Sequence, residues 1–186
     1  VAIAGDRGAG KSTTSMALRA RGHSLLVDDV TLVEFDDGAA TATPFARNVH
    51  LLEDSADALG LDFDSLPLLA GGRAKVAFRP EDPPPGSRRI DRIVVLDPRP
   101  DAEAVEVREA LGAERFAALM AHTARDGVAP LVLGQQRYFE LLTALAAAVP
   151  VWIVTRPAGA WTLEGVVDRI EGLSRPAADS VSASAR

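Results

Sequence analysis

Two spacings of apolar residues alternate along the chain. Short apolar runs bounded by Gly, Asp or Pro are typical of buried strands, and they predict strands at 1–4, 25–27, 75–78, 90–96 and 151–155. Longer segments with apolar residues at helical spacing predict helices at 12–21, 54–60, 102–111, 114–124, 135–148 and 163–173. Strands that alternate with helices in this way indicate an α/β domain.

A hairpin interrupts this alternation. Residues 30–35 alternate apolar and polar positions, Asp36-Asp37-Gly38 is a turn signal, and 39–43 predict the returning strand. With 186 residues the chain fits one domain, which we expect to cover 1–173. Residues 174–186 are small, polar and rich in Pro, Ala and Ser, so we expect a disordered tail there. Val1 already lies inside a predicted strand, and we expect this domain to be truncated at its N-terminus.

Charge and composition exclude several classes of function. The net charge of −6 argues against a nucleic-acid partner, because such proteins normally present a basic face. The chain has no Cys, which excludes disulfides and thiolate metal sites and fits the cytoplasm. No apolar run approaches the ~20 residues that a membrane helix needs, so no membrane contact is predicted.

A glycine-rich segment joins the first predicted strand to the first predicted helix. Its spacing, G-x-x-x-x-G-K-S, is that of a phosphate-binding P-loop, and strand, loop and helix follow in the required order. Glycines let the backbone turn its N–H groups toward phosphate oxygens, and the helix adds its positive end. Lys11 can then reach the β- and γ-phosphates, and the Ser12 hydroxyl can hold Mg²⁺. The predicted ATP-binding residues are Gly5, Asp6, Arg7, Gly8, Ala9, Gly10, Lys11, Ser12 and Thr13.

Two adjacent carboxylates, Asp28 and Asp29, follow the second predicted strand. Carboxyl ends of neighbouring parallel strands border the same crevice, so both side chains are expected near the γ-phosphate. One can bind Mg²⁺, and the other can accept the proton of an attacking hydroxyl. Asp36 and Asp37 have the same two side chains, but the following Gly38 indicates an ordinary turn.

These features together resemble a known family. Residues 8–12 (GAGKS) and 21–30 (RGHSLLVDDV) are similar, at this spacing, to the catalytic domain of HPr kinase/phosphorylase. The resemblance covers roughly the first 35 residues and implies a fold like that of phosphoenolpyruvate carboxykinase. It implies an ATP- and Mg²⁺-dependent kinase that phosphorylates a protein serine and assembles as a homo-oligomer. By this resemblance, Lys11 would bind phosphate and Ser12 and Asp28 would bind the metal. Asp29 would be the general base, supported by Asp28.

Other segments resemble compact HPr-kinase-like proteins of peptide-modification gene clusters, including lasso-peptide kinases. The segments are 44–47 (PFAR), Lys75 before a short strand, and 149–152 (VPVW) with the final helix. By this looser resemblance, Arg47 and Lys75 would contact the substrate. The chain has Thr13 where the HPr-kinase family has Glu, and it lacks that family's acidic loop beside Arg-Gly-Leu-Gly.

Three functions follow from these observations. The first is a serine kinase acting on a protein or peptide. The second is a small-metabolite P-loop kinase, which a closed polar pocket would favour, whereas an open groove beside Asp29 would favour a peptide. The third is a non-catalytic ATP-binding regulator, suggested by Thr13 and the absent acidic loop. The residues leave the acceptor open, and they do not decide between ATP and pyrophosphate as the donor.

Overall fold

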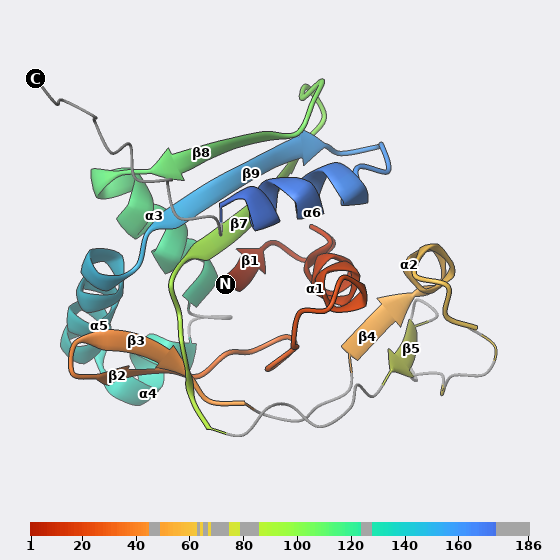
Figure 1. Cartoon of the computed structure of the whole chain (residues 1–186). Helices are drawn as coiled ribbons and strands as arrows, with labels where there is room; N and C mark the ends of the chain where they lie inside the picture. The colour runs from red at the N-terminus through yellow and green to blue at the C-terminus, as the bar shows by residue number, and fades with distance from the viewer. Residues whose placement is uncertain are drawn as a thin grey trace, which may run out of the picture.

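A mixed β-sheet with helices on both faces organises the chain in the computed structural model (Figure 1). The structure describes residues 1–44, 49–62, 64, 67, 75–78, 86–123 and 128–173. The sheet has the order β1-β7-β9-β8, and its strands are β1 (Ala2–Gly5), β7 (Ile93–Arg99), β9 (Val151–Pro157) and β8 (Glu106–Ala110). The first three are parallel and β8 is antiparallel to β9. The predicted α/β class is therefore confirmed.

Alternate residues of the central strand β7 face two separate cores, as the pleat of a strand requires. Val94 and Leu96 pack with the helices α1 (Lys11–Ala20) and α6 (Leu163–Gly172). Ile93 and Val95 pack on the opposite face with α3 (Gly112–Thr123) and α5 (Gln135–Ala148). The short helix α4 (Val128–Leu133) contacts α5. Both faces of the sheet are thus covered, which explains why β7 and β9 are apolar at consecutive positions.

Two small antiparallel sheets complete the described fold. The predicted hairpin is present as β2 (Val33–Asp36) and β3 (Ala39–Ala42), and β3 also pairs with β6 (Arg88–Arg89). The second sheet pairs β4 (Val49–Leu52) with β5 (Lys75–Phe78), and α2 (Glu53–Ala58) follows β4 directly. Met16 of α1 packs with Val49 and Leu51, so this unit lies against α1.

Two predicted elements are wrong. Residues 25–27 form no strand, because Leu25 packs against the core of Met16 and Val49 without joining a ladder. The helix predicted at 102–111 is instead the strand β8, since pairing with β9 overrides the helix propensity of Glu and Ala. The helix α4 was not predicted, although Pro130 in its first turn is compatible with a helix. The predicted tail at 174–186 lies outside the described residues.

The end of α1 directs the chain toward the aspartate pair. Gly22 has φ 97°, as expected for the residue that terminates a helix. The Gly22 N–H donates to the Arg19 carbonyl at 2.9 Å, and the His23 N–H donates to the Leu18 carbonyl at 3.1 Å. This pair of bonds is the Schellman motif, which satisfies the last carbonyls of the helix.

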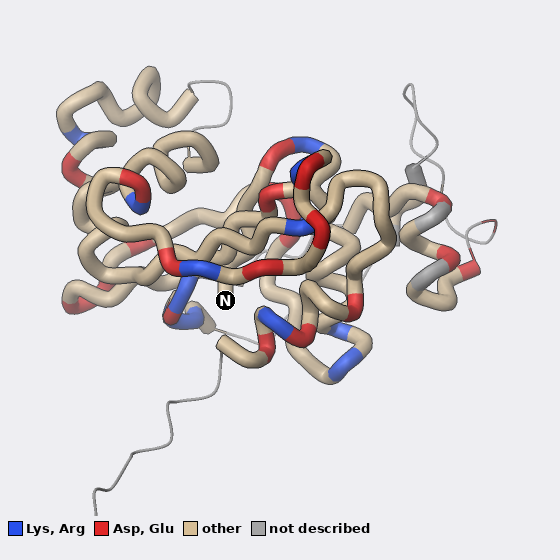
Figure 2. Tube along the Cα trace, turned by 90° about the horizontal axis from the view of Figure 1, so that it is seen from above, with Lys and Arg blue, Asp and Glu red and all other residues tan. Residues whose placement is uncertain are grey.

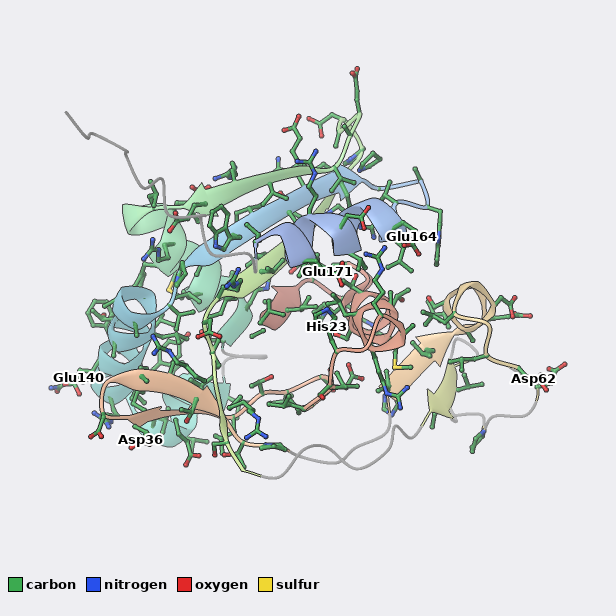
Figure 3. The ribbon with its side chains drawn as sticks, in the orientation of Figure 1. His23, Asp36, Asp62, Glu140, Glu164 and Glu171 are labelled. Atoms are coloured by element: carbon green, nitrogen blue, oxygen red, sulfur yellow. The ribbon has the colours of Figure 1, made fainter. Side chains whose placement is uncertain are left out.

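An ion-pair cluster holds the same end of α1 against α6. Arg21 bonds Asp168, Glu171 and Glu164 of α6. His23 Nε2 lies 2.9 Å from Glu171 Oε1, and Figure 3 shows these two side chains between the helices. His23 therefore acts as a structural contact in this fold.

The surface carries charges of both signs. Figure 2 shows acidic and basic residues interspersed over the face seen from above, which agrees with the low net charge per residue. None of the helices that the structure describes is long and apolar enough to cross a membrane.

Candidate functional site

The loop between β1 and α1, residues 5–10, owes its shape to three glycines. Gly8 and Gly10 have φ of 86° and 98°, a region that residues with a Cβ rarely adopt. At Gly5 (φ 143°) a Cβ would lie 2.8 Å from the Leu96 carbonyl oxygen of β7. Glycine at position 5 is therefore needed for close packing on the neighbouring strand, while Gly8 and Gly10 make the turn.

Lys11 places a cation directly on this loop. Its Nζ donates to the carbonyl oxygens of Gly5 and Asp6, both at 2.9 Å. An ammonium group has three donors, so one remains for a ligand. Helix α1 begins at Lys11, and no side chain caps it at Gly10. Its first N–H groups and the positive end of its dipole consequently face the loop, which suits an anion.

The structure brings the aspartate pair to the loop. Ser12 Oγ donates to Asp28 Oδ1 at 3.1 Å, and the backbone N–H of His50 in β4 contacts Asp28 Oδ2 at 3.4 Å. The expected closeness of the pair to the loop is therefore seen for Asp28. Its cause differs from the expected one, because Asp28 reaches Ser12 from an irregular segment and not from the end of a parallel strand.

Asp29 has an unusual backbone conformation. Its φ is 68°, one of two positive values at non-glycine residues in the described chain. Asp tolerates this left-handed conformation better than most residues. The turn exposes Asp29 and places it on the wall of the cavity that contains residues 5–13. Adjacent side chains thus have separate environments: Asp28 is tied to Ser12, and Asp29 borders the open space.

Thr13 and Asp6 contact residues to which the sequence assigned no role. Thr13 Oγ1 donates to Ser55 Oγ of α2 at 2.9 Å, which links the first turn of α1 to the β4–α2 unit. His122 Nδ1 of α3 lies 3.9 Å from Asp6 Oδ1. Burial lowers the pKa of His122, Asp6 opposes this shift, and Lys11 adds to it. His122 therefore lies close enough to the loop for the charges of Asp6 and Lys11 to act on its imidazole.

Arg156, at the carboxyl end of β9, also reaches the loop. Its Nη2 donates to the Ala9 carbonyl at 3.0 Å, and its Nη1 donates to the Pro157 carbonyl at 3.3 Å. Burial lowers the pKa of this guanidinium. The sequence analysis did not select Arg156. The available signal was a cation immediately after an apolar parallel strand, at the edge where ligands bind.

One large cavity is lined by Lys11, Ser12, Asp29, His122 and Arg156. Its volume is about 1370 Å³, and its walls include the glycine loop, segment 29–33, parts of α3 and α5, and segment 158–163. Pockets for small ligands usually measure about 300–1,000 Å³, so this cavity exceeds that class. Val30 and Leu32, which follow Asp29 in the chain and line the cavity, are 61% and 65% exposed. The cavity therefore has polar groups at the glycine loop and exposed apolar side chains at Val30 and Leu32.

The remaining predicted residues are less informative. Arg47 lies outside the described residues, and Lys75 is placed only as the first residue of β5, opposite Leu52. Within the described ranges, no three or more His, Asp or Glu side chains gather as a metal site. Ser12 and Asp28 offer two oxygen ligands, which fits Mg²⁺, because this ion commonly takes few protein ligands and binds phosphates and water besides.

Comparisons of this chain with protein-family models, with curated proteins and with solved structures found no match.

Proposed function

We propose that this protein is an ATP-dependent serine kinase of the HPr-kinase-like type, which phosphorylates a hydroxyl of a protein or peptide. The observation that carries the proposal is the 3.1 Å bond from Ser12 Oγ to Asp28 Oδ1. It joins a P-loop, residues 5–12, to a pair of carboxylates that a simple phosphate-binding loop does not need. A phosphate site beside a general base is what transfer to a hydroxyl requires.

The loop supplies charge and orientation for the donor. Lys11 keeps one N–H donor beyond its bonds to Gly5 and Asp6, and the first amides of α1 lack a side-chain cap. These groups can bind the phosphate oxygens of ATP and hold the γ-phosphate in line for attack. Ser12 and Asp28 would hold Mg²⁺, which neutralises charge on the phosphates when it is bound.

Asp29 is the proposed general base. A serine hydroxyl in the cavity gives its proton to Asp29, and its oxygen forms a bond to the γ-phosphorus. The bond from that phosphorus to the β–γ bridging oxygen breaks, and ADP leaves with the electron pair. Asp28 supports the base in this scheme: its carboxylate, which would bind the metal, also bonds Ser12 and the backbone of His50 and so positions Ser12.

The cavity supports a peptide acceptor over a small metabolite. Its volume of about 1370 Å³, which donor and acceptor would share, exceeds the usual range of about 300–1,000 Å³ for a single small ligand. The exposed apolar side chains Val30 and Leu32 follow Asp29 on the cavity wall and suit the apolar side chains of a peptide. We place this reaction in the cytoplasm, and the family resemblance implies a homo-oligomeric enzyme.

The test is transfer of labelled γ-phosphate from ATP to serine-containing peptides with apolar residues beside the serine. We expect phosphoserine with the parent chain and none with Lys11→Ala, which should also lose ATP binding. Thr41→Ala in β3 is a control, because within the described residues that hydroxyl donates only to the Glu34 backbone carbonyl of its own hairpin. Tight ATP binding without any transfer would instead support the regulator, and transfer to free metabolites but no peptide would support the second function.

A further inference from the structure

The helix α4 carries an apolar surface that the described fold leaves exposed. Its sequence, from Val128 to Leu133, has no charged or polar side chain, and none of its residues is buried. Val132 is 76% exposed and Leu133 is 45% exposed. Adjacent apolar side chains in contact with water are unfavourable, and such groups commonly mark a surface that binds a partner. Packing within the described fold therefore does not explain why α4 is apolar on all sides.

Backbone and side-chain contacts hold α4 in a defined place. Gly134 has φ 78°, and its N–H donates to the Pro130 carbonyl at 3.0 Å, which closes the last turn of α4 before α5 begins at Gln135. The helix then lies beside α5 (Figure 1). Tyr138 Oη of α5 in turn lies 3.2 Å from Thr123 Oγ1 at the end of α3. The exposed surface of α4 therefore belongs to a wall built from three connected helices.

One side of α4 lines the cavity of the proposed kinase site. Ala129 and Leu133 lie one helical turn apart, so they share a face of the helix. Both line the cavity that also contains Lys11 and Asp29. Val132 precedes Leu133 and is exposed to solvent. The apolar surface of α4 thus continues from the cavity wall to the outside of the molecule.

The distribution of charge in the cavity indicates what kind of molecule this wall binds. The Lys, Arg, Asp and Glu residues that line the cavity lie in the glycine loop, at the start of α1, in the segment after Asp28 and at the end of β9: Asp6, Arg7, Lys11, Asp29 and Arg156. The described residues that α3, α4 and α5 contribute to the lining include none of these four types. That wall therefore suits apolar side chains, whereas phosphates suit the glycine loop.

We propose that the apolar surface of α4, formed by Val128, Ala129, Val132 and Leu133, binds an apolar segment of the acceptor peptide that is separate from the phosphorylated serine. The proposal rests on the proposed function, because it assumes that a peptide serine reaches Asp29. An acceptor that extends from Asp29 along this cavity wall meets α4. The substrate class is then a peptide with a serine and, elsewhere in its chain, a segment of large apolar residues.

The test compares two synthetic peptides that contain the same single serine. In the leucine peptide an alanine spacer separates the serine from a run of leucines, and in the glutamine peptide glutamines replace the leucines. Each is made with the run before and after the serine. The parent should have a KM about tenfold lower for the leucine peptide in one of the two orders, since burial of one large apolar side chain contributes about that much.

Variants of α4 locate this preference. Val132→Gln and Leu133→Gln should each raise the KM for the leucine peptide toward that for the glutamine peptide, without a change in kcat or in the KM for ATP. The matched control is Leu111→Gln. Leu111 is a 63% exposed leucine between β8 and α3, outside the residues that line the cavity, and its replacement should leave every KM at the parental value.

Other occupants of the surface give different results. Phosphorylation of both peptides with equal KM values, or a preference that both α4 variants retain, would overturn the docking surface and leave the kinase in place. A smaller particle mass for Val132→Gln by light scattering, with unchanged KM values, would assign the surface to a second copy of the chain. Loss of binding to phosphatidylcholine vesicles in that variant, again with unchanged KM values, would assign it to a membrane. If the parent phosphorylates neither peptide, the proposed function is wrong, and this inference fails with it.

Discussion

Two aspartate pairs in this chain are alike in sequence and differ in their surroundings. In both, the second residue has a left-handed backbone: φ is 68° at Asp29 and 45° at Asp37. Asp36 ends β2 opposite Ala39, so the second pair makes the tight turn of a hairpin. Asp28 bonds Ser12 and the His50 amide, so the first pair joins three distant segments. Figure 3 shows Asp36 at the edge of the molecule, far from the helix α1.

The comparison separates structure that neighbouring residues determine from structure that includes contacts with distant segments. A dipeptide followed by glycine needs only its own turn to be stable, and Asp there is chosen for its backbone. Asp28-Asp29 has no following glycine. The Val30 N–H donates to the Asp28 carbonyl at 2.9 Å across Asp29, and the Asp28 carboxylate also bonds Ser12 of α1 and the backbone of His50 in β4. The first pair therefore combines a left-handed residue on a cavity wall, Asp29, with a neighbour that distant segments bind, Asp28, and uncommon backbone conformations of this kind cluster at functional sites.

The strongest test of the comparison exchanges one carboxylate for an amide in each pair. Asp29→Asn should lower kcat for peptide phosphorylation about 10²- to 10⁴-fold, because the amide cannot accept the hydroxyl proton. Asp37→Asn is the matched control, with the same chemistry and the same sign of φ, and it should retain parental kcat. Steady-state kinetics measure kcat of both variants, and a titration with ATP checks that they bind ATP as tightly as the parent. If Asp29→Asn transfers phosphate as fast as the parent, Asp29 is not the base.

The sequence predicts local features of this site well. The residue types at 5–12 predict the turn and the start of the helix, and Gly22 marks the observed end of α1. The hairpin of the second aspartate pair is likewise encoded by Asp37-Gly38. In these segments the residues that determine the conformation are neighbours in the chain, so a single sequence contains the information.

Features that depend on distant partners were missed. Residues 25–27 are apolar because Leu25 packs on the Met16 core, and a pattern does not distinguish this from a buried strand. Segment 106–110 becomes a strand only because β9 lies beside it. The bond from Arg156 to Ala9 spans 147 positions. Such contacts arise from the topology of the sheet, and no local pattern encodes them.

A second prediction concerns the bond that connects Ser12 with Asp28. A double-mutant cycle with Ser12→Ala and Asp28→Asn should give a coupling of about 0.5–1.5 kcal/mol in the free energy of unfolding, as for one partly buried hydrogen bond. Thr43 and Glu34 form a comparable hydroxyl–carboxylate bond of 3.0 Å near the second pair, but it is exposed. Its cycle should give a smaller coupling, and urea titrations measure both. Equal couplings would show that the Ser12–Asp28 bond holds the first pair no more strongly than an exposed bond of the hairpin region.

The smallest expected effect concerns a carboxylate outside both pairs. Bonds from His23 and then Arg21 lower the pKa of Glu171 below its ordinary value of 4.5. A lowered pKa in the folded state means that this carboxylate stabilises the fold fully above pH 4.5, and that the contribution is lost as the pH falls through the lowered pKa. The urea midpoint of Glu171→Gln should therefore lie below that of the parent at pH 7, and the two should converge toward pH 3. Glu140→Gln, which changes exposed contacts with Arg137 and Gln136 inside α5, is the control and should stay near the parent throughout. A constant difference between parent and Glu171→Gln from pH 7 to 3 would mean that packing, and not charge, joins this end of α1 to α6, and that the segment leading to Asp28 is held without its ion pairs.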